Sequence, residues 1–178
     1  MGFLAFATRI KLAAEAINAQ RENESILIGR ETVALIRNRV QNDKTNAEGQ
    51  PFGQYSRALV PQWFFYNKAL SLGADRKLHT GNWFVSYEEF RDMNNLNTGD
   101  INFTFSGDMW RNTGVTNVKN EGNSTTVTIG GQTTRAQNIQ EWQEPRYGNI
   151  LEANEEEKQM IYDAHTERIN KIINTYLT

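Results

Sequence analysis

Apolar residues recur at helical spacing along residues 3–40. A first stripe, at intervals of three and four, consists of Phe3, Phe6, Ile10, Ala13 and Ile17. The polar run 18–25 breaks this register, and a second stripe consists of Ile26, Gly29, Val33, Ile36 and Val40. The pattern predicts either one long helix with a rotated apolar face or two helices that meet near residues 20–25. An unbroken helix would span roughly 60 Å at ~1.5 Å per residue, more than the width of a small domain.

Residues 43–82 follow no sustained period. They contain two of the three prolines and many turn-forming residues. A connection of about forty residues without regular structure is uncommon in an isolated domain and often becomes ordered against a partner. Residues 86–96 predict a short helix, because Ser86 and Glu89 have the spacing of a capping box.

Strict alternation returns at residues 100–106 and then stops. Ile101, Phe103 and Phe105 share one face of a predicted strand. We expect Gly107 to end the strand with a positive φ, and one helical turn to follow over residues 108–111. Ser106 is the expected cap of this turn, and Met109 and Trp110 are expected to pack beneath it.

The remaining sequence predicts a hairpin and two helices. Segments 114–119 and 124–131 flank a turn at 120–123, with Val127 and Ile129 on one face. Residues 133–142 predict a short helix that stops before Pro145. Asn154 and Glu157 have N-cap and N3 spacing and predict the start of a closing helix. Its expected buried side consists of Ile161, His165, Ile169, Ile172 and Tyr176.

The element order predicts an α+β fold. We expect a long N-terminal helix or helix pair, a small antiparallel sheet with a β-hairpin, and a C-terminal helix. The expected organisation is an N-terminal helical region over residues 1–42, an extended irregular connection over 43–82, and an α+β body with the C-terminal helix over 83–178.

Composition and charge narrow the function. The chain has 178 residues, a net charge of −2, 9 Phe, 4 Trp, 6 Tyr and no Cys. The charge argues against a protein that mainly wraps nucleic acid, which needs a basic face. Without Cys, neither disulfides nor thiolate metal sites can form. No apolar run reaches 18 residues, so we expect no membrane-spanning segment.

No catalytic motif is assembled in the sequence. His79 and His165 lack metal-ligand spacing; we expect His165 to be a partly buried structural residue and His79 to be solvated. Ser106 is not in a GxSxG motif, because position 104 is Thr. We therefore expect a non-enzymatic protein without catalytic residues, cofactor or metal.

Four consecutive aromatic residues, Trp63, Phe64, Phe65 and Tyr66, form an unusual tract. One interpretation is a segment that is buried on both faces. Another is a candidate subunit interface in which the rings anchor a neighbouring chain, since large aromatics dominate interface energetics. Stacking on single-stranded nucleic acid ranks last, because few basic residues lie nearby.

Three short blocks follow one another in a recognisable order. They consist of Gly49, Phe52, Tyr55 and Ser56, then Ile101, Phe103, Phe105, Gly107, Met109 and Trp110, then Ala136, Gln137, Tyr147 and Gly148. In this order, over about residues 26–160, the chain resembles the head–tail connector proteins of tailed bacteriophages, the neck or tail-completion family. It departs from the family pattern by its longer N-terminal helix, its aromatic tract and its few basic residues between Tyr55 and Asp100.

The resemblance implies a virion structural protein, assembled in the cytoplasm of a host bacterium. Such a subunit forms a homo-oligomeric ring that bridges the portal complex and the tail. Its implied partners are copies of itself and portal, adaptor and tail proteins, with non-specific contact to packaged DNA as a further option and no membrane. The alternatives are a tail terminator subunit and a non-enzymatic soluble binding or scaffold module.

Overall fold

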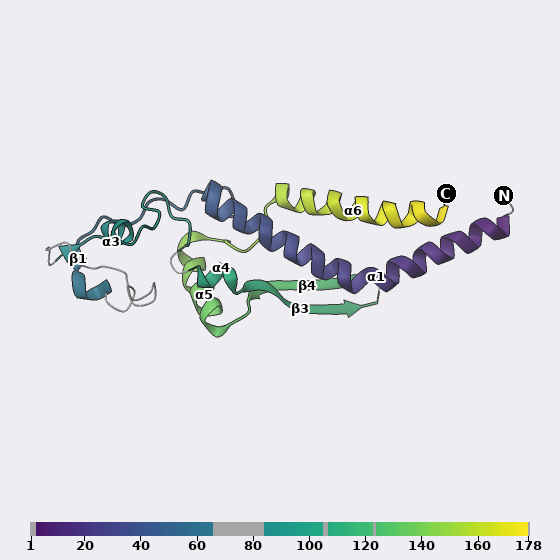
Figure 1. Cartoon of the computed structure of the whole chain (residues 1–178), viewed down its shortest axis with the longest axis horizontal. Helices are drawn as coiled ribbons and strands as arrows, with labels where there is room; N and C mark the ends of the chain where they lie inside the picture. Colours follow the sequence, from purple (N-terminus) through teal and green to yellow (C-terminus); the bar gives the residue numbers. More distant parts are fainter. Residues whose placement is uncertain (1–2, 66–83, 105–106, 123, 178) are drawn as a thin grey trace. The chain divides into compact units, whose positions relative to one another are not determined.

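The computed structural model describes residues 3–65, 84–104, 107–122 and 124–177 (Figure 1). The fold is α+β, as predicted, with long helices at both ends of the chain and two small antiparallel sheets. The chain divides into two compact units, each assembled from separate stretches. Unit 1 comprises Met1–Ile36, Thr113–Gln132 and Leu151–Thr178, and unit 2 comprises Arg37–Asn112 and Thr133–Ile150.

Helix α1 runs without interruption from Phe3 to Asn38, which is the first of the two predicted alternatives. A π-helical turn, η1, continues it over Arg39–Asp43. Lys44 ends this turn in the left-handed conformation, at φ 60°, and its N–H donates to the carbonyl of Arg39. Within the described ranges, none of the helices combines the length and apolar content that crossing a bilayer requires.

The predicted hairpin belongs to unit 1. Strands β3 (Thr113–Glu121) and β4 (Ser124–Gly131) are antiparallel, with Val118 opposite Val127 and an irregularity after Val115. The hairpin meets α1 at Gly29, where a Cβ atom would lie 2.5 Å from Val115 and 2.8 Å from Val127. Glycine therefore allows a close approach that no larger residue fits.

Helix α6 (Glu155–Leu177) begins with the predicted capping box. The N–H of Glu157 donates to Asn154, and the N–H of Asn154 donates to the Glu157 carboxylate. Of its described side chains only Glu157 is buried, and the predicted inner stripe is half-buried. Ion pairs join α6 to α1: the guanidinium of Arg168 lies 2.8 Å from the carboxylate of Glu24 and 2.9 Å from that of Glu31.

The core of unit 2 surrounds two short antiparallel strands, β1 (Val60–Pro61) and β2 (Phe84–Val85). A 3-10 turn, η2 (Gln62–Phe65), follows β1, and helix α3 (Tyr87–Met93) follows β2. The predicted capping box of Ser86 and Glu89 starts α3. Phe65, Val85 and Phe90 form the buried cluster, in which the Phe65 and Phe90 rings stack at 4.6 Å.

Helix α4 (Asp108–Arg111) is the predicted single turn, and Gly107 precedes it at φ 76°. Met109 and Trp110 are buried beneath this turn, as expected. The N-cap position is Gly107, whereas the predicted cap, Ser106, lies outside the described residues.

The predicted strand over residues 100–105 is wrong in its described part. Ile101 to Thr104 form no strand, and Phe103 adopts a positive φ of 52°. The Asn102 side chain competes with ladder pairing, because its Oδ1 accepts hydrogen bonds from the Tyr55 hydroxyl and from the N–H of Thr104. Phe105 lies outside the described residues.

Helix α5 (Thr134–Tyr147) is longer than predicted, because it continues through Pro145. Proline removes one hydrogen-bond donor near the helix end, where the freed carbonyl of Glu141 is on an exposed residue. The helix closes at Gly148, whose N–H donates to the carbonyl of Glu144 at 2.9 Å.

Candidate functional site

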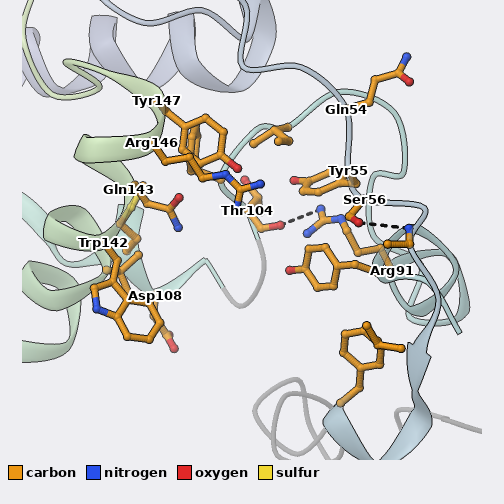
Figure 2. A pocket seen from close by; sticks show the side chains of 18 of the residues that line it. Gln54, Tyr55, Ser56, Arg91, Thr104, Asp108, Trp142, Gln143, Arg146 and Tyr147 are labelled. Atoms are coloured by element: carbon orange, nitrogen blue, oxygen red, sulfur yellow. Dashed lines mark hydrogen bonds between the residues drawn. The ribbon is translucent and has the colours of Figure 1, made fainter. Parts of the chain in front are cut away.

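A pocket of about 600 Å³ opens in unit 2 (Figure 2). It brings together the three blocks that lie far apart in the sequence: Tyr55 comes from the first, Phe103 and Met109 from the second, and Tyr147 from the third. Phe64 and Phe65 of the aromatic tract also line it. Sequence reasoning identified these residues separately, and the fold places them around one space.

Residues 46–47, just before the first block, are hydrogen-bonded to the end of the third block beside this pocket. Asn46 donates from its side-chain amide to the carbonyl of Tyr147 at 3.1 Å, and the N–H of Ala47 donates to the carbonyl of Asn149 at 3.0 Å. Phe103 then packs edge-to-face on Phe52 at 4.6 Å and on Tyr147 at 4.9 Å. These contacts join one residue from each block in a single aromatic group.

Arg91 forms the polar centre of the pocket wall. It is almost fully buried, its Nε donates to the carbonyl of Asn97 at 2.6 Å, and its Nη2 donates to the carbonyl of Thr104 at 2.8 Å (Figure 2). The guanidinium carbon lies 3.9 Å from the centre of the Tyr55 ring. Backbone carbonyls and a ring face therefore compensate for part of the cost of burying this charge.

Burial shifts the pKa values of two tyrosines beside Arg91. Desolvation raises the pKa of Tyr55, and hydrogen bonding to Asn102 and the charge of Arg91 oppose this effect. Desolvation likewise raises the pKa of Tyr87, against the charge of Arg91. Both phenols are therefore held in their neutral form more firmly than in water.

Helix α5 supplies the opposite wall. Figure 2 shows Trp142, Gln143, Arg146 and Tyr147 along this helix, across the pocket from Tyr55 and Arg91. Trp142 is 84% exposed, although its side chain belongs to the pocket lining. A pocket lined by aromatic side chains with several polar groups among them is suited to bind an apolar or aromatic group of a partner.

The aromatic tract is divided between core and surface. Trp63 is 66% exposed and Phe64 is half-exposed, whereas Phe65 is only 1% exposed. Tyr66 lies outside the described residues. Leu59 and Phe84 of the same unit are also exposed. Trp63 and Phe64 stay candidates for a subunit interface, and Phe65 is a core residue.

The described residues contain no arrangement that holds a metal, since no three His, Asp or Glu side chains converge. His165 is half-buried, with Nδ1 3.7 Å from a carboxylate oxygen of Glu24. The other histidine, His79, lies outside the described residues. The acidic group in the pocket, Asp108, forms ion pairs with Arg111 and Arg135.

Two site residues, Arg91 and Trp142, escaped sequence reasoning. Arg91 follows two acidic residues in a short amphipathic helix, and nothing in that pattern signals a buried guanidinium. Trp142 did carry a signal, because it is a large apolar residue between Glu141 and Gln143 in an otherwise polar helix.

Comparisons with protein-family models, with curated proteins and with solved structures find no match for this chain.

Proposed function

We propose that this protein is a non-enzymatic structural subunit of the head–tail connector of a tailed bacteriophage, located in the virion. Copies of the chain would form a ring between the portal complex and the tail. The identity of the assembly comes from the resemblance of the three sequence blocks to neck and tail-completion proteins. The structure adds the physical argument for assembly.

The observation that carries the proposal is that several large apolar side chains are exposed to solvent on both units. On α1, Phe3 is 85% and Leu4 83% exposed. On unit 2, Trp63 and Trp142 are similarly uncovered. Phe3 and Phe6 lie one turn apart on α1, and exposed apolar side chains that gather in this way are typical of interaction sites. A ring subunit needs two different contact surfaces, one for each neighbour.

The pocket of unit 2 favours a second candidate, a soluble binding or scaffold module. Its aromatic lining and the exposed Trp142 at its edge would accept an apolar side chain of a partner. In a connector the same pocket would receive a segment of an adaptor or tail protein. The alternative within the same virion is that the protein is the tail terminator subunit, at the upper end of the tail.

Cryo-electron microscopy of the virion that incorporates this chain tests the proposal. We expect density for a closed ring of this protein between portal and tail. Density at the upper end of the tail tube alone would favour the tail terminator. Absence of the protein from purified virions would contradict the proposal and favour the binding module.

A further inference from the structure

Unit 1 has two uncovered surfaces of opposite charge. The first, the basic helix end, covers residues 3–14 of α1, which contain Arg9 and Lys11 and no acidic residue. Its exposed apolar side chains are Phe3, Leu4, Phe6, Ile10 and Leu12. The N-terminus of a helix is the positive end of its dipole, which adds to this charge. No acidic residue in the first turn of α1 offsets it.

The second surface, the acidic helix start, covers residues 152–163 at the beginning of α6. Four of the five acidic residues in this segment are exposed, Glu157 is buried in the capping box, and the segment holds a single lysine, Lys158. Met160 and Tyr162 are exposed there. Glu156, Met160 and Asp163 follow one another at intervals of four and three, so they lie on one side of the helix. An apolar residue is thus framed by carboxylates.

The two surfaces cannot meet within one copy of unit 1. Helices α1 and α6 are antiparallel, because Arg9 contacts the carbonyl of Leu177 while Glu31 contacts Arg168 (Figure 1). Tyr162 therefore lies roughly 22 Å along α6 from the end that Arg9 contacts, at ~1.5 Å per residue. The basic helix end and the acidic helix start are at opposite ends of the helix pair.

We propose that the basic helix end of one copy packs on the acidic helix start of the next copy. Phe3 and Leu4 would cover Met160, and Arg9 and Lys11 would approach the carboxylates of Glu156 and Asp163. A contact between different surfaces is heterologous, so it propagates from copy to copy and closes into a ring when the rotation allows. This inference rests on the proposed function, since it assigns the contact between ring subunits.

The existing partners of the two basic residues leave them available. Lys11 forms an exposed ion pair with Glu15 at 3.8 Å, and such a surface pair contributes little. Arg9 donates one Nη1 hydrogen bond, at a long 3.4 Å, to Leu177. Opposite charges at a rim mainly raise the association rate and fix the register, whereas the apolar side chains supply affinity.

Charge reversal in two variants tests this contact by sedimentation velocity of the purified full chain. The first variant is R9E/K11E and the second is E156K/D163K. Each variant alone places like charges across the contact, and we expect its self-association Kd to rise about tenfold or more. In an equimolar mixture, alternation of the two variants restores opposite charges at every contact of a ring with an even number of copies, so we expect it to associate like the wild type. A misfolded variant could not be rescued by mixing.

Matched controls carry the same change in charge elsewhere. R30E/K119E reverses two exposed basic residues of unit 1 outside both surfaces. E141K/E144K reverses two exposed acidic residues of α5. Both controls are expected to associate like the wild type. Sodium chloride at 1 M, where the Debye length is ~3 Å, should weaken the wild-type contact and narrow its difference from the variants.

Five outcomes would overturn the inference. The wild type could stay monomeric up to about 1 mM or stop at a dimer. Only R9E/K11E could weaken association, which would indicate pairing between two basic helix ends. Charge reversal could leave a wild-type ring unchanged, which would remove this contact and leave the proposed function standing. Cosedimentation with anionic phospholipid vesicles without self-association would assign the basic helix end to a lipid surface. If mixing the two variants restores association but the protein is absent from purified virions, the contact between copies stands and only the proposed function is contradicted.

Discussion

Gly148 carries two separate constraints at the scale of a single residue. Its φ of 75° lies in the left-handed region, and an added Cβ atom would lie 2.8 Å from the side-chain nitrogen of Asn46. The side-chain amide of Asn46 donates to the carbonyl of Tyr147 in the third block. The glycine of the third block is therefore explained by its backbone conformation and by its neighbour.

We predict that Gly148→Ala lowers the free energy of unfolding by about 2 kcal/mol or more, from strain plus displacement of Asn46. Gly49→Ala is the matched control, because Gly49 has φ 76° with open space around it. It should lose only about 1 kcal/mol. Gly99→Ala, without a positive φ or a close neighbour, should change little. Urea denaturation measures the free energy of unfolding of all three variants. Equal losses in Gly148→Ala and Gly49→Ala would show that the Asn46 side chain moves aside at no cost.

The buried tyrosines predict loss of stability at alkaline pH. The folded-state pKa of Tyr55 and of Tyr87 is raised above the ordinary value of about 10. Their contribution is therefore fully present below pH 10 and is lost as the pH rises through the raised folded-state pKa values. Ultraviolet absorbance should show late phenol ionisation that coincides with unfolding of unit 2.

The double variant Tyr55→Phe/Tyr87→Phe is the control for this prediction. It should remove the late ionisation and flatten the alkaline fall in stability. It should also be somewhat less stable at neutral pH, because the Tyr55 hydroxyl hydrogen bond to Asn102 is lost. An unchanged alkaline profile in the double variant would assign the effect to other groups.

At the scale of secondary-structure elements, local signals in the sequence were sufficient where the element is regular. The stripes of α1, the capping boxes of α3 and α6, and the alternation of β3 and β4 all predicted what is observed. The predicted strand at residues 101–104 was wrong because a contact remote in sequence decides their conformation: the Tyr55 hydroxyl donates a hydrogen bond to the Asn102 side chain. Alternation alone cannot show such a partner.

Gly29 determines how closely α1 and the hairpin approach in unit 1. We predict that Gly29→Leu separates them, because its side chain would enter the space filled by Val115 and Val127. The expected loss is about 2–3 kcal/mol, and amide exchange across β3 and β4 should accelerate. Ala34→Leu, at an exposed position of the same helix, is the control and should change little. Unchanged exchange in Gly29→Leu would contradict the close packing.

At the scale of the whole molecule, the sequence pointed to the aromatic tract as a candidate interface but not to the pocket. Consecutive aromatic residues are visible in the sequence, so the tract 63–66 could be identified. Which ring points inward could not, because it depends on the stacking of Phe65 on Phe90. The pocket joins residues from α3, the loops and α5, and only the fold brings these together.

Exposed and buried members of the tract predict opposite effects. Trp63→Ala/Phe64→Ala should impair assembly while changing the free energy of unfolding by only about 1 kcal/mol, because Trp63 is mostly exposed and Phe64 is half-exposed. Phe65→Ala is the matched control and should cost about 3–5 kcal/mol, because it opens a cavity beside Phe90. Thermal melting and sedimentation velocity measure the two effects. A large loss of stability in the double variant would make the tract an ordinary core.

The claim that other chains cover the exposed apolar side chains is tested most directly by native mass spectrometry of the purified full-length protein over a range of concentrations. The account predicts a closed oligomer that grows at the expense of the monomer as concentration rises. A protein that stays monomeric throughout would contradict the account.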